Sequence, residues 1–98
     1  MWEVDMQDDL GRLIEKAAAV LKAAGAREVY VFGSAAEGNM RPQSDVDLAV
    51  AGLPPQVFFA AMSEAADVLG RPLDMIDLDE PSRFTEYLVR KGKLRRVA

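Results

Sequence analysis

Hydrophobic residues recur along the chain with two spacings, one typical of helices and the other of strands. Between about residues 8 and 24, apolar residues fall at every third or fourth position, which predicts an amphipathic helix. The same spacing runs from a turn at 52–55 to about residue 69, and again over about 81–91. Strands are predicted where β-branched residues gather or polar and apolar residues alternate, at 28–32, 45–51 and 72–78.

The order of these elements predicts a small α/β (α+β) fold of the form α-β-(turn)-β-α-β-α, with a three-stranded mixed sheet flanked by helices. A compact polar stretch joins the first two strands, which favours antiparallel pairing. The helix before the third strand allows the crossover that a parallel pair requires. The C-terminal end of the first strand and the N-terminal ends of the other two are then expected at one edge of the sheet.

Composition narrows the possible chemistry. The 98 residues suit one domain over 1–98. There is no Cys and no His, so disulfides, thiolate zinc sites and histidine-based catalysis are excluded. Metal or acid–base chemistry must come from carboxylates, which prefer hard cations such as Mg²⁺. No apolar run approaches the roughly 20 residues of a membrane helix, and the acidic start lacks the pattern of a signal peptide, so we expect a cytoplasmic protein without membrane contact.

Charge is divided unevenly along the chain, although the net charge is only −4. Residues 1–80 hold 6 Lys and Arg against 15 Asp and Glu, whereas residues 81–98 hold 6 against 1. An acidic body argues against direct binding of nucleic acid. The basic end either binds a phosphate or an acidic partner, or complements a helix C-terminus and continues as a solvated tail. Its cations are Arg90, Lys91, Lys93, Arg95 and Arg96.

Residues suited to phosphate and metal chemistry fall at the predicted sheet edge. Gly33 and Ser34 end the first strand, where backbone N–H groups can meet a phosphate. Asp45 and Asp47 are two residues apart and therefore share one face of the second strand. The topology brings Asp74 of the third strand to the same edge. Three carboxylates without His or Cys favour Mg²⁺ or Mn²⁺, which promote phosphoryl or nucleotidyl transfer.

The spacing of these residues forms a longer motif. Gly33-Ser34, ten further residues and then Asp45-x-Asp47 resemble the signature of the DNA polymerase β-like nucleotidyltransferase superfamily. The segment is similar to the GSxxxG…PxSDxDL of the minimal nucleotidyltransferases, a match that extends to Gly38, Pro42, Ser44 and Leu48. The stretch 70–81 also resembles the strand that carries the third carboxylate of that family, here Asp74.

This resemblance implies the nucleotidyltransferase fold and a role for each motif residue. Gly33 and Ser34 would hold the triphosphate of ATP. Asp45 and Asp47 would bind two Mg²⁺ ions, with Mn²⁺ as a substitute. Asp74 would complete the second metal site and activate the attacking hydroxyl group.

Two further carboxylates bear on this assignment. Asp77 is the rival of Asp74, but it lies three residues further on and is expected on the opposite face of the sheet. Glu37 stands where many relatives have an Arg that contacts the triphosphate. We expect Arg41 to supply the missing positive charge.

The size of the chain bears on its partner. Larger relatives carry a helical domain that grips the base or the acceptor, and 98 residues have no room for one. Similarity to the minimal nucleotidyltransferases implies a small helical HEPN-domain partner, and in some such pairs an antitoxin transfers AMP to a tyrosine hydroxyl of its toxin. We therefore expect a Mg²⁺-dependent adenylyltransferase that acts as an antitoxin. The alternative is a binding module that neutralises its partner by occlusion, and transfer to a small molecule such as an aminoglycoside ranks third.

Overall fold

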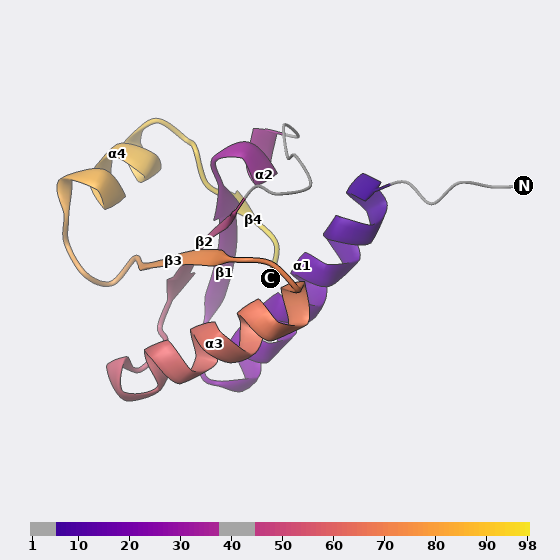
Figure 1. Cartoon of the computed structure of the whole chain (residues 1–98). Helices are drawn as coiled ribbons and strands as arrows, with labels where there is room; N and C mark the ends of the chain where they lie inside the picture. The colour runs from indigo at the N-terminus through magenta and orange to yellow at the C-terminus, as the bar shows by residue number, and fades with distance from the viewer. Residues whose placement is uncertain (1–5, 38–44) are drawn as a thin grey trace, which may run out of the picture.

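The computed structural model describes residues 6–37 and 45–98, and these form helices on both faces of one sheet (Figure 1). The predicted helices and strands are present, and each begins and ends within a few residues of its expected bounds. None of the helices in these ranges is both long enough and apolar enough to cross a membrane. In chain order the elements are α1 (Met6–Ala23), β1 (Glu28–Phe32), α2 (Ser34–Glu37), β2 (Val46–Ala51), the 3-10 turn η1 (Pro55–Val57), α3 (Phe58–Leu69), β3 (Leu73–Asp77), α4 (Arg83–Arg90) and β4 (Arg95–Arg96).

The strands form a mixed sheet in the order β3-β2-β1-β4. β1 and β2 are antiparallel, with Phe32 opposite Asp47, and β2 and β3 are parallel, with Asp47 beside Asp74. The predicted fold class and both predicted pairings are confirmed. The predicted number of strands is wrong, because the basic end adds a fourth strand, antiparallel to β1, with Arg96 opposite Tyr30.

The hydrophobic pattern does not predict β4, because both of its residues are Arg. Gly92, with a φ of +64°, lies between α4 and β4, in a left-handed conformation that suits the end of a helix. Beyond β4, the Val97 N–H donates a hydrogen bond to the Val29 carbonyl at 2.9 Å, and the Val29 N–H donates to the Ala98 carbonyl at 3.0 Å. The segment expected to be a solvated tail therefore covers the outer edge of β1.

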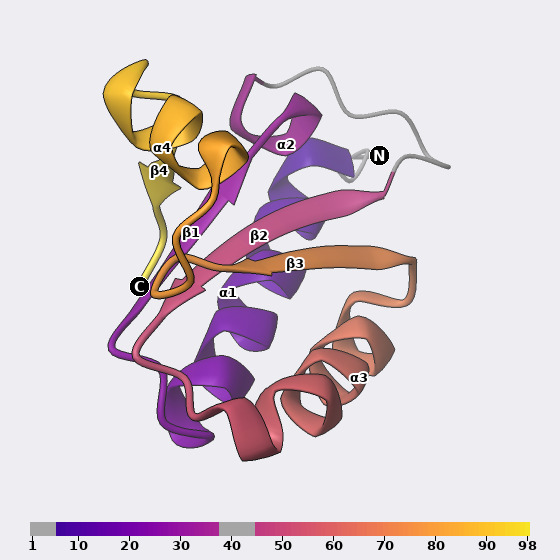
Figure 2. The same cartoon turned by 90° about the vertical axis from the view of Figure 1, so that its left-hand side faces the viewer.

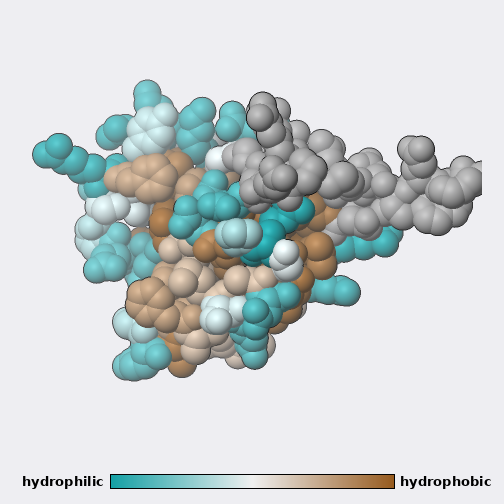
Figure 3. Space-filling model, in the orientation of Figure 1, coloured by the Kyte–Doolittle hydropathy of each residue, from teal (hydrophilic) through white to brown (hydrophobic). Residues whose placement is uncertain are grey.

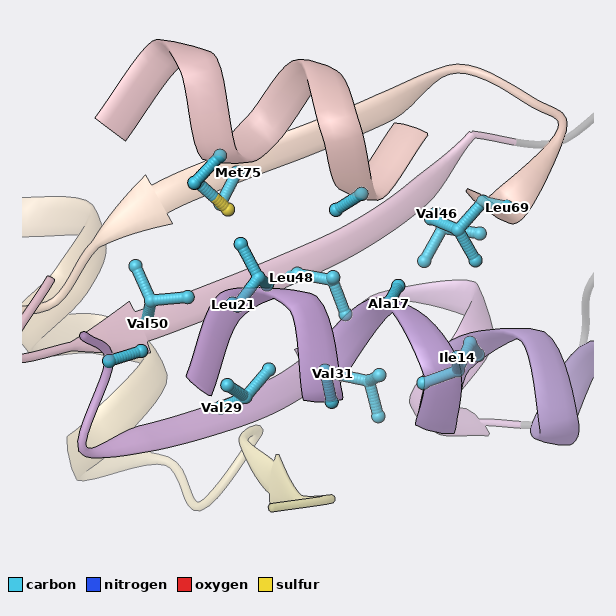
Figure 4. Packing of buried hydrophobic residues seen from close by; sticks show 14 of the residues in the cluster. Ile14, Ala17, Leu21, Val29, Val31, Val46, Leu48, Val50, Leu69 and Met75 are labelled. Atoms are coloured by element: carbon cyan, nitrogen blue, oxygen red, sulfur yellow. The ribbon is translucent and has the colours of Figure 1, made fainter. Parts of the chain in front are cut away.

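α1 and α3 pack against one face of the sheet, and α4 lies on the other (Figures 1 and 2). The main core lies between the sheet and the first two of these helices (Figure 4), where the side chains of Leu21, Val46, Leu48 and Val50 are fully buried. Each such burial contributes roughly 1.5–3 kcal/mol. The core therefore fixes the register of β2, because a slip by one residue would turn Asp47 into it.

A smaller cluster on the opposite face holds α4 in place. It contains Phe32, Ala49 and Leu88, and Phe84 of α4 packs edge-on against Phe32 with ring centroids 5.8 Å apart. α4 begins after Ser82, whose side chain accepts a hydrogen bond from a backbone N–H of the first turn, as helix caps do. α4 is thereby anchored to the last residue of β1, next to the predicted site.

Candidate functional site

Asp47 and Asp74 lie side by side on neighbouring parallel strands. They are register partners, and neighbouring strands are about 4.8 Å apart. Because Val46 and Leu48 face the main core, Asp47 points to the opposite face of the sheet. Asp45 lies immediately before β2 and is exposed, close enough for its charge to act on Asp47. The fold thus brings the three predicted carboxylates to one edge of the sheet.

Their proximity changes the protonation of Asp47. Burial raises the pKa of the Asp47 carboxyl, and the negative charges of Asp74 and Asp45 raise it further. Among the described residues, no three ligand-type side chains converge tightly enough to enclose a metal ion. The donor set still fits a hard divalent cation, since these oxygens are the ligands that Mg²⁺ prefers and a cation would relieve their repulsion. Metal binding by Asp45, Asp47 and Asp74 stays a prediction.

Gly33 provides the turn that lets Asp47 approach the end of β1. Its φ is +66°, a left-handed conformation that favours glycine. A Cβ atom on Gly33 would collide with Oδ2 of Asp47. Ser34 follows as the first residue of α2, and the N–H groups of Ala36 and Glu37 donate to the Gly33 carbonyl at 3.1 and 3.2 Å. The predicted phosphate-binding turn and a predicted metal ligand are therefore in direct contact.

Asp77 lies away from this group of carboxylates. It pairs in register with Val50, at the C-terminal end of β3. Its Oδ1 accepts a hydrogen bond from the backbone N–H of Asp79 at 2.9 Å. Because Asp77 and Asp74 are three residues apart, they face opposite sides of the sheet. The Asp77 carboxylate therefore belongs to the turn after β3, and Asp74 remains the candidate.

Glu37 ends α2 with an exposed side chain that makes no ion pair with any residue in the described part of the chain. Its negative charge lies on the short helix that follows the Gly33 turn, and the charges that raise the pKa of Asp47 are those of Asp74 and Asp45. Arg41, which is predicted to offset it, lies outside the described residues, as do Gly38, Pro42 and Ser44 of the motif. The role of Arg41 stays a prediction.

Sequence reasoning missed the position of the basic end. Because β4 runs antiparallel to β1, the residues before Arg95 lie beside the end of β1 from which Gly33 continues. A weak signal was present in the two apolar residues that flank the Arg pair. Leu94 packs into the smaller cluster and Val97 packs against the main core, as two strand residues three apart would.

Asp47→Asn is expected to raise the free energy of unfolding of the metal-free protein at neutral pH. Folding raises the pKa of the Asp47 carboxyl above its ordinary value of 3.8. Such a group stabilises the folded protein at pH values below 3.8, and this contribution is lost as the pH rises through the folded-state pKa. Asn avoids that loss, so the gain should appear at neutral pH and shrink in acid. Urea unfolding at several pH values with EDTA measures it, and Asp67→Asn on the exposed side of α3 is the control. A gain that persisted in acid would contradict the argument.

Comparison with known proteins identifies the family and the fold of the chain. The family model described as "Polymerase beta, Nucleotidyltransferase" matches residues 15–94. None of the curated proteins matches the chain in sequence.

Several solved structures share the fold. One, assigned as a minimal nucleotidyltransferase, has a TM-score of 0.74 and 24% identity over 100% of this chain and 99% of its own. A chain of a toxin–antitoxin complex with AMP-PNP has a TM-score of 0.70 and 22% identity, over 84% of this chain and 70% of its own. A chain of the complex of tri-AMPylated Shewanella oneidensis HEPN toxin with MNT antitoxin has a TM-score of 0.63 and 21% identity, over 88% of this chain and 70% of its own. The family model covers well over half of this chain, and the chain therefore belongs to the polymerase beta nucleotidyltransferase family.

Proposed function

We propose that this protein is a Mg²⁺-dependent adenylyltransferase that transfers AMP from ATP to a hydroxyl group, that of a tyrosine, on a HEPN-type toxin, and so acts as an antitoxin. The observation that carries the proposal is the group formed by Asp45, Asp47 and Asp74 beside the turn at Gly33. Carboxylates next to a phosphate-binding turn are the arrangement that nucleotidyl transfer requires.

Each residue has a defined task in the proposed reaction. Gly33 and Ser34 hold the triphosphate. Asp45, Asp47 and Asp74 are the residues that would hold divalent cations, whose chemistry is to neutralise charge on the phosphates and on the leaving group. Asp74 also accepts the proton of the acceptor hydroxyl.

The transfer itself is a displacement at phosphorus. The acceptor oxygen forms a bond to the α-phosphorus, the bond from that phosphorus to the bridging oxygen breaks, and pyrophosphate leaves. The exposure of Asp45 and Asp74 supports this role, because an acceptor on a second protein must reach the site from solvent.

A protein partner is supported by two observations. Among the structures with this fold is the MNT antitoxin bound to a tri-AMPylated HEPN toxin. The chain also exposes apolar side chains, with Phe59 73% and Phe84 49% exposed, around a groove of about 600 Å³ between the start of α3, β3 and the start of α4. Hydrophobic surface is visible over both helices in Figure 3. Exposed aromatic residues beside a groove are typical anchors for a partner.

Phe59→Asp is therefore expected to weaken binding of the toxin partner by roughly 30-fold, or about 2 kcal/mol, as loss of an interface anchor does. The side chain is largely exposed, so the fold should be unaffected. Isothermal titration of the purified toxin measures the affinity. Ala60→Asp adds the same charge to the same turn of α3 outside the groove, and it should bind normally. Equal affinities for both variants would exclude this groove as the interface.

A second candidate function is neutralisation by occlusion without catalysis. The exposed carboxylate of Glu37 favours it, because a negative charge in this position opposes polyphosphate binding. Two assays separate the functions: incubation of the protein with the toxin, Mg²⁺ and labelled ATP, and protection of cells that express the toxin. Label on the toxin supports transfer. Protection of cells without any label supports occlusion.

A further inference from the structure

We propose that the open edge of β3 binds an extended segment of the toxin as an additional strand, and that this pairing brings the acceptor hydroxyl to Asp74. The inference rests on the proposed adenylyl transfer and identifies the form in which the acceptor is recognised. Three features of the described residues carry it: the outer backbone edge of β3, the groove along that edge, and the position of Asp74 on the same strand.

The backbone of β3 has one free side. β3 is the outermost strand of a sheet with the order β3-β2-β1-β4 (Figure 2). It pairs in parallel with β2, and the Val46 N–H donates a hydrogen bond to the Pro72 carbonyl at 3.1 Å. In a parallel pair, alternate residues direct both backbone groups to the neighbouring strand, so the even-numbered residues of 72–78 bond to β2. The N–H and C=O groups of Leu73 and Met75 therefore point away from the sheet, and no other described strand pairs with them.

The groove of about 600 Å³ follows this edge and has an aromatic wall on each side. β3 contributes Met75 and Ile76, the start of α3 contributes Phe59, and α4 contributes Phe84. Met75 packs into the main core and Ile76 into the smaller cluster, so the groove spans both faces of the sheet at the edge of β3. Hydrophobic surface over α3 and over α4 lies on either side of β3 in Figures 1 and 3. Because side chains of a strand alternate between the two faces, an added strand would place apolar side chains against both walls.

Asp74 connects this edge with the candidate site. It is exposed and lies on the same face as Ile76, two residues or about 7 Å along the strand from the groove. Asp47 of β2 lies on its inner side, and its outer side is the open edge. A residue of an added strand beside Asp74 would lie about 5 Å away. A hydroxyl side chain in that position is next to the carboxylate that is proposed to accept its proton.

Charge selects the occupant of the edge. Asp77 and Glu80 line the groove, and none of the described residues that line it is Lys or Arg. β3 itself carries Asp74 and Asp77 among its five residues. A second copy of this chain would bring the same charges, and like charges on facing strands oppose pairing. The complement is a toxin segment with apolar residues for the two walls and a Lys or Arg near Glu80. Backbone pairing combined with side-chain pockets is a general mode of recognising extended peptides.

Hydrogen exchange resolved to single residues, in the free protein and in its complex with the purified toxin, tests the pairing. Strand addition should slow exchange at Leu73 and Met75 by at least about tenfold. Exchange at Asp74 and Ile76 should change little, because their N–H groups already bond to β2. This alternation distinguishes an added strand from a helix that lies over the groove, since a helix has no free row of backbone groups to offer.

Glu80→Lys tests the charge of the bound segment. Reversal of this charge should raise the Kd for the toxin roughly tenfold in a calorimetric titration. Glu86→Lys makes the same change on an exposed position of α4 outside the groove, and it should bind within about twofold of the parent. Circular dichroism verifies that both variants are folded.

The outcomes separate this inference from the proposed function. If the toxin is labelled but exchange at Leu73 and Met75 does not slow, the inference is overturned and adenylyl transfer stands. The inference is also overturned if these two residues become protected in the protein alone as its concentration rises, since a second copy then occupies the edge. Equal binding of the toxin by Glu80→Lys and Glu86→Lys overturns it as well.

The position of the label on the toxin gives the last check. Mass spectrometry should find the modified tyrosine within the toxin segment that becomes protected from exchange in the complex. A modified tyrosine outside that segment would overturn the inference and leave adenylyl transfer intact. If the toxin neither binds nor becomes labelled, both the inference and the proposed function fall.

Discussion

Asp45→Asn/Asp47→Asn is expected to lower the rate of AMP transfer to the toxin by at least about 10³-fold. Asn keeps the size of each side chain and removes the charge that would bind divalent cations. The fold should be retained, because Asp45 is exposed and Asp47 faces away from the main core, where its charge is disfavoured in the metal-free protein. Incubation with toxin, Mg²⁺ and labelled ATP, followed by counting of the labelled toxin, measures the rate.

The control for this variant is Glu64→Gln/Asp67→Asn, which removes two exposed carboxylates from α3, on the opposite face of the sheet. It should label the toxin at the normal rate. Equal labelling by Asp45→Asn/Asp47→Asn would exclude the proposed mechanism. Asp45→Asn/Asp47→Asn also separates the two candidate functions in cells. The variant would still protect against the toxin if the antitoxin acts by occlusion, and it would not protect if the antitoxin acts by catalysis.

The sequence was sufficient to predict the sheet around the site. The alternation of Val46, Leu48 and Val50 with polar or small residues specifies which face of β2 is buried, and therefore which way Asp47 points. The helix between β2 and β3 specifies a parallel pair, which places Asp74 beside Asp47. The alternation in β2 is a local pattern, and the parallel pairing of β2 with β3 follows from one topological rule. Both determine the structure because burial of the apolar face contributes most of the stabilising free energy.

What the sequence did not predict depends on pairings between remote segments. Nothing in Arg95-Arg96 indicates a strand, because charged residues carry no hydrophobic alternation; the pair is ordered by the open edge of β1 and by the flanking Leu94 and Val97. The contact between Gly33 and Asp47 is of the same kind. A glycine at the end of β1 predicts a turn, but only the register of β1 with β2 shows what a side chain there would meet.

That contact leads to the second large effect, for Gly33→Ala. An alanine at a φ of +66° costs about 1–2 kcal/mol of stability from the backbone alone. In addition, its Cβ atom would displace the Asp47 carboxylate, and misplacement of a catalytic group by about 1 Å lowers a rate by about 10²-fold. We expect AMP transfer to fall by about that factor, with unfolding free energy measured in urea and transfer measured with labelled ATP.

Gly70→Ala separates the two causes. Gly70 has a similar φ of +70°, but a Cβ atom there would meet nothing within 4 Å, so this variant should lose the backbone contribution to stability and keep full activity. Removal of the carboxylate gives a further check. In an Asp47→Ala background, Gly33→Ala should cost no more stability than Gly70→Ala, because the atom that it would displace is absent. If Gly33→Ala matched Gly70→Ala in both stability and transfer with Asp47 present, the turn would not position the carboxylate, and Gly33 would serve the backbone alone.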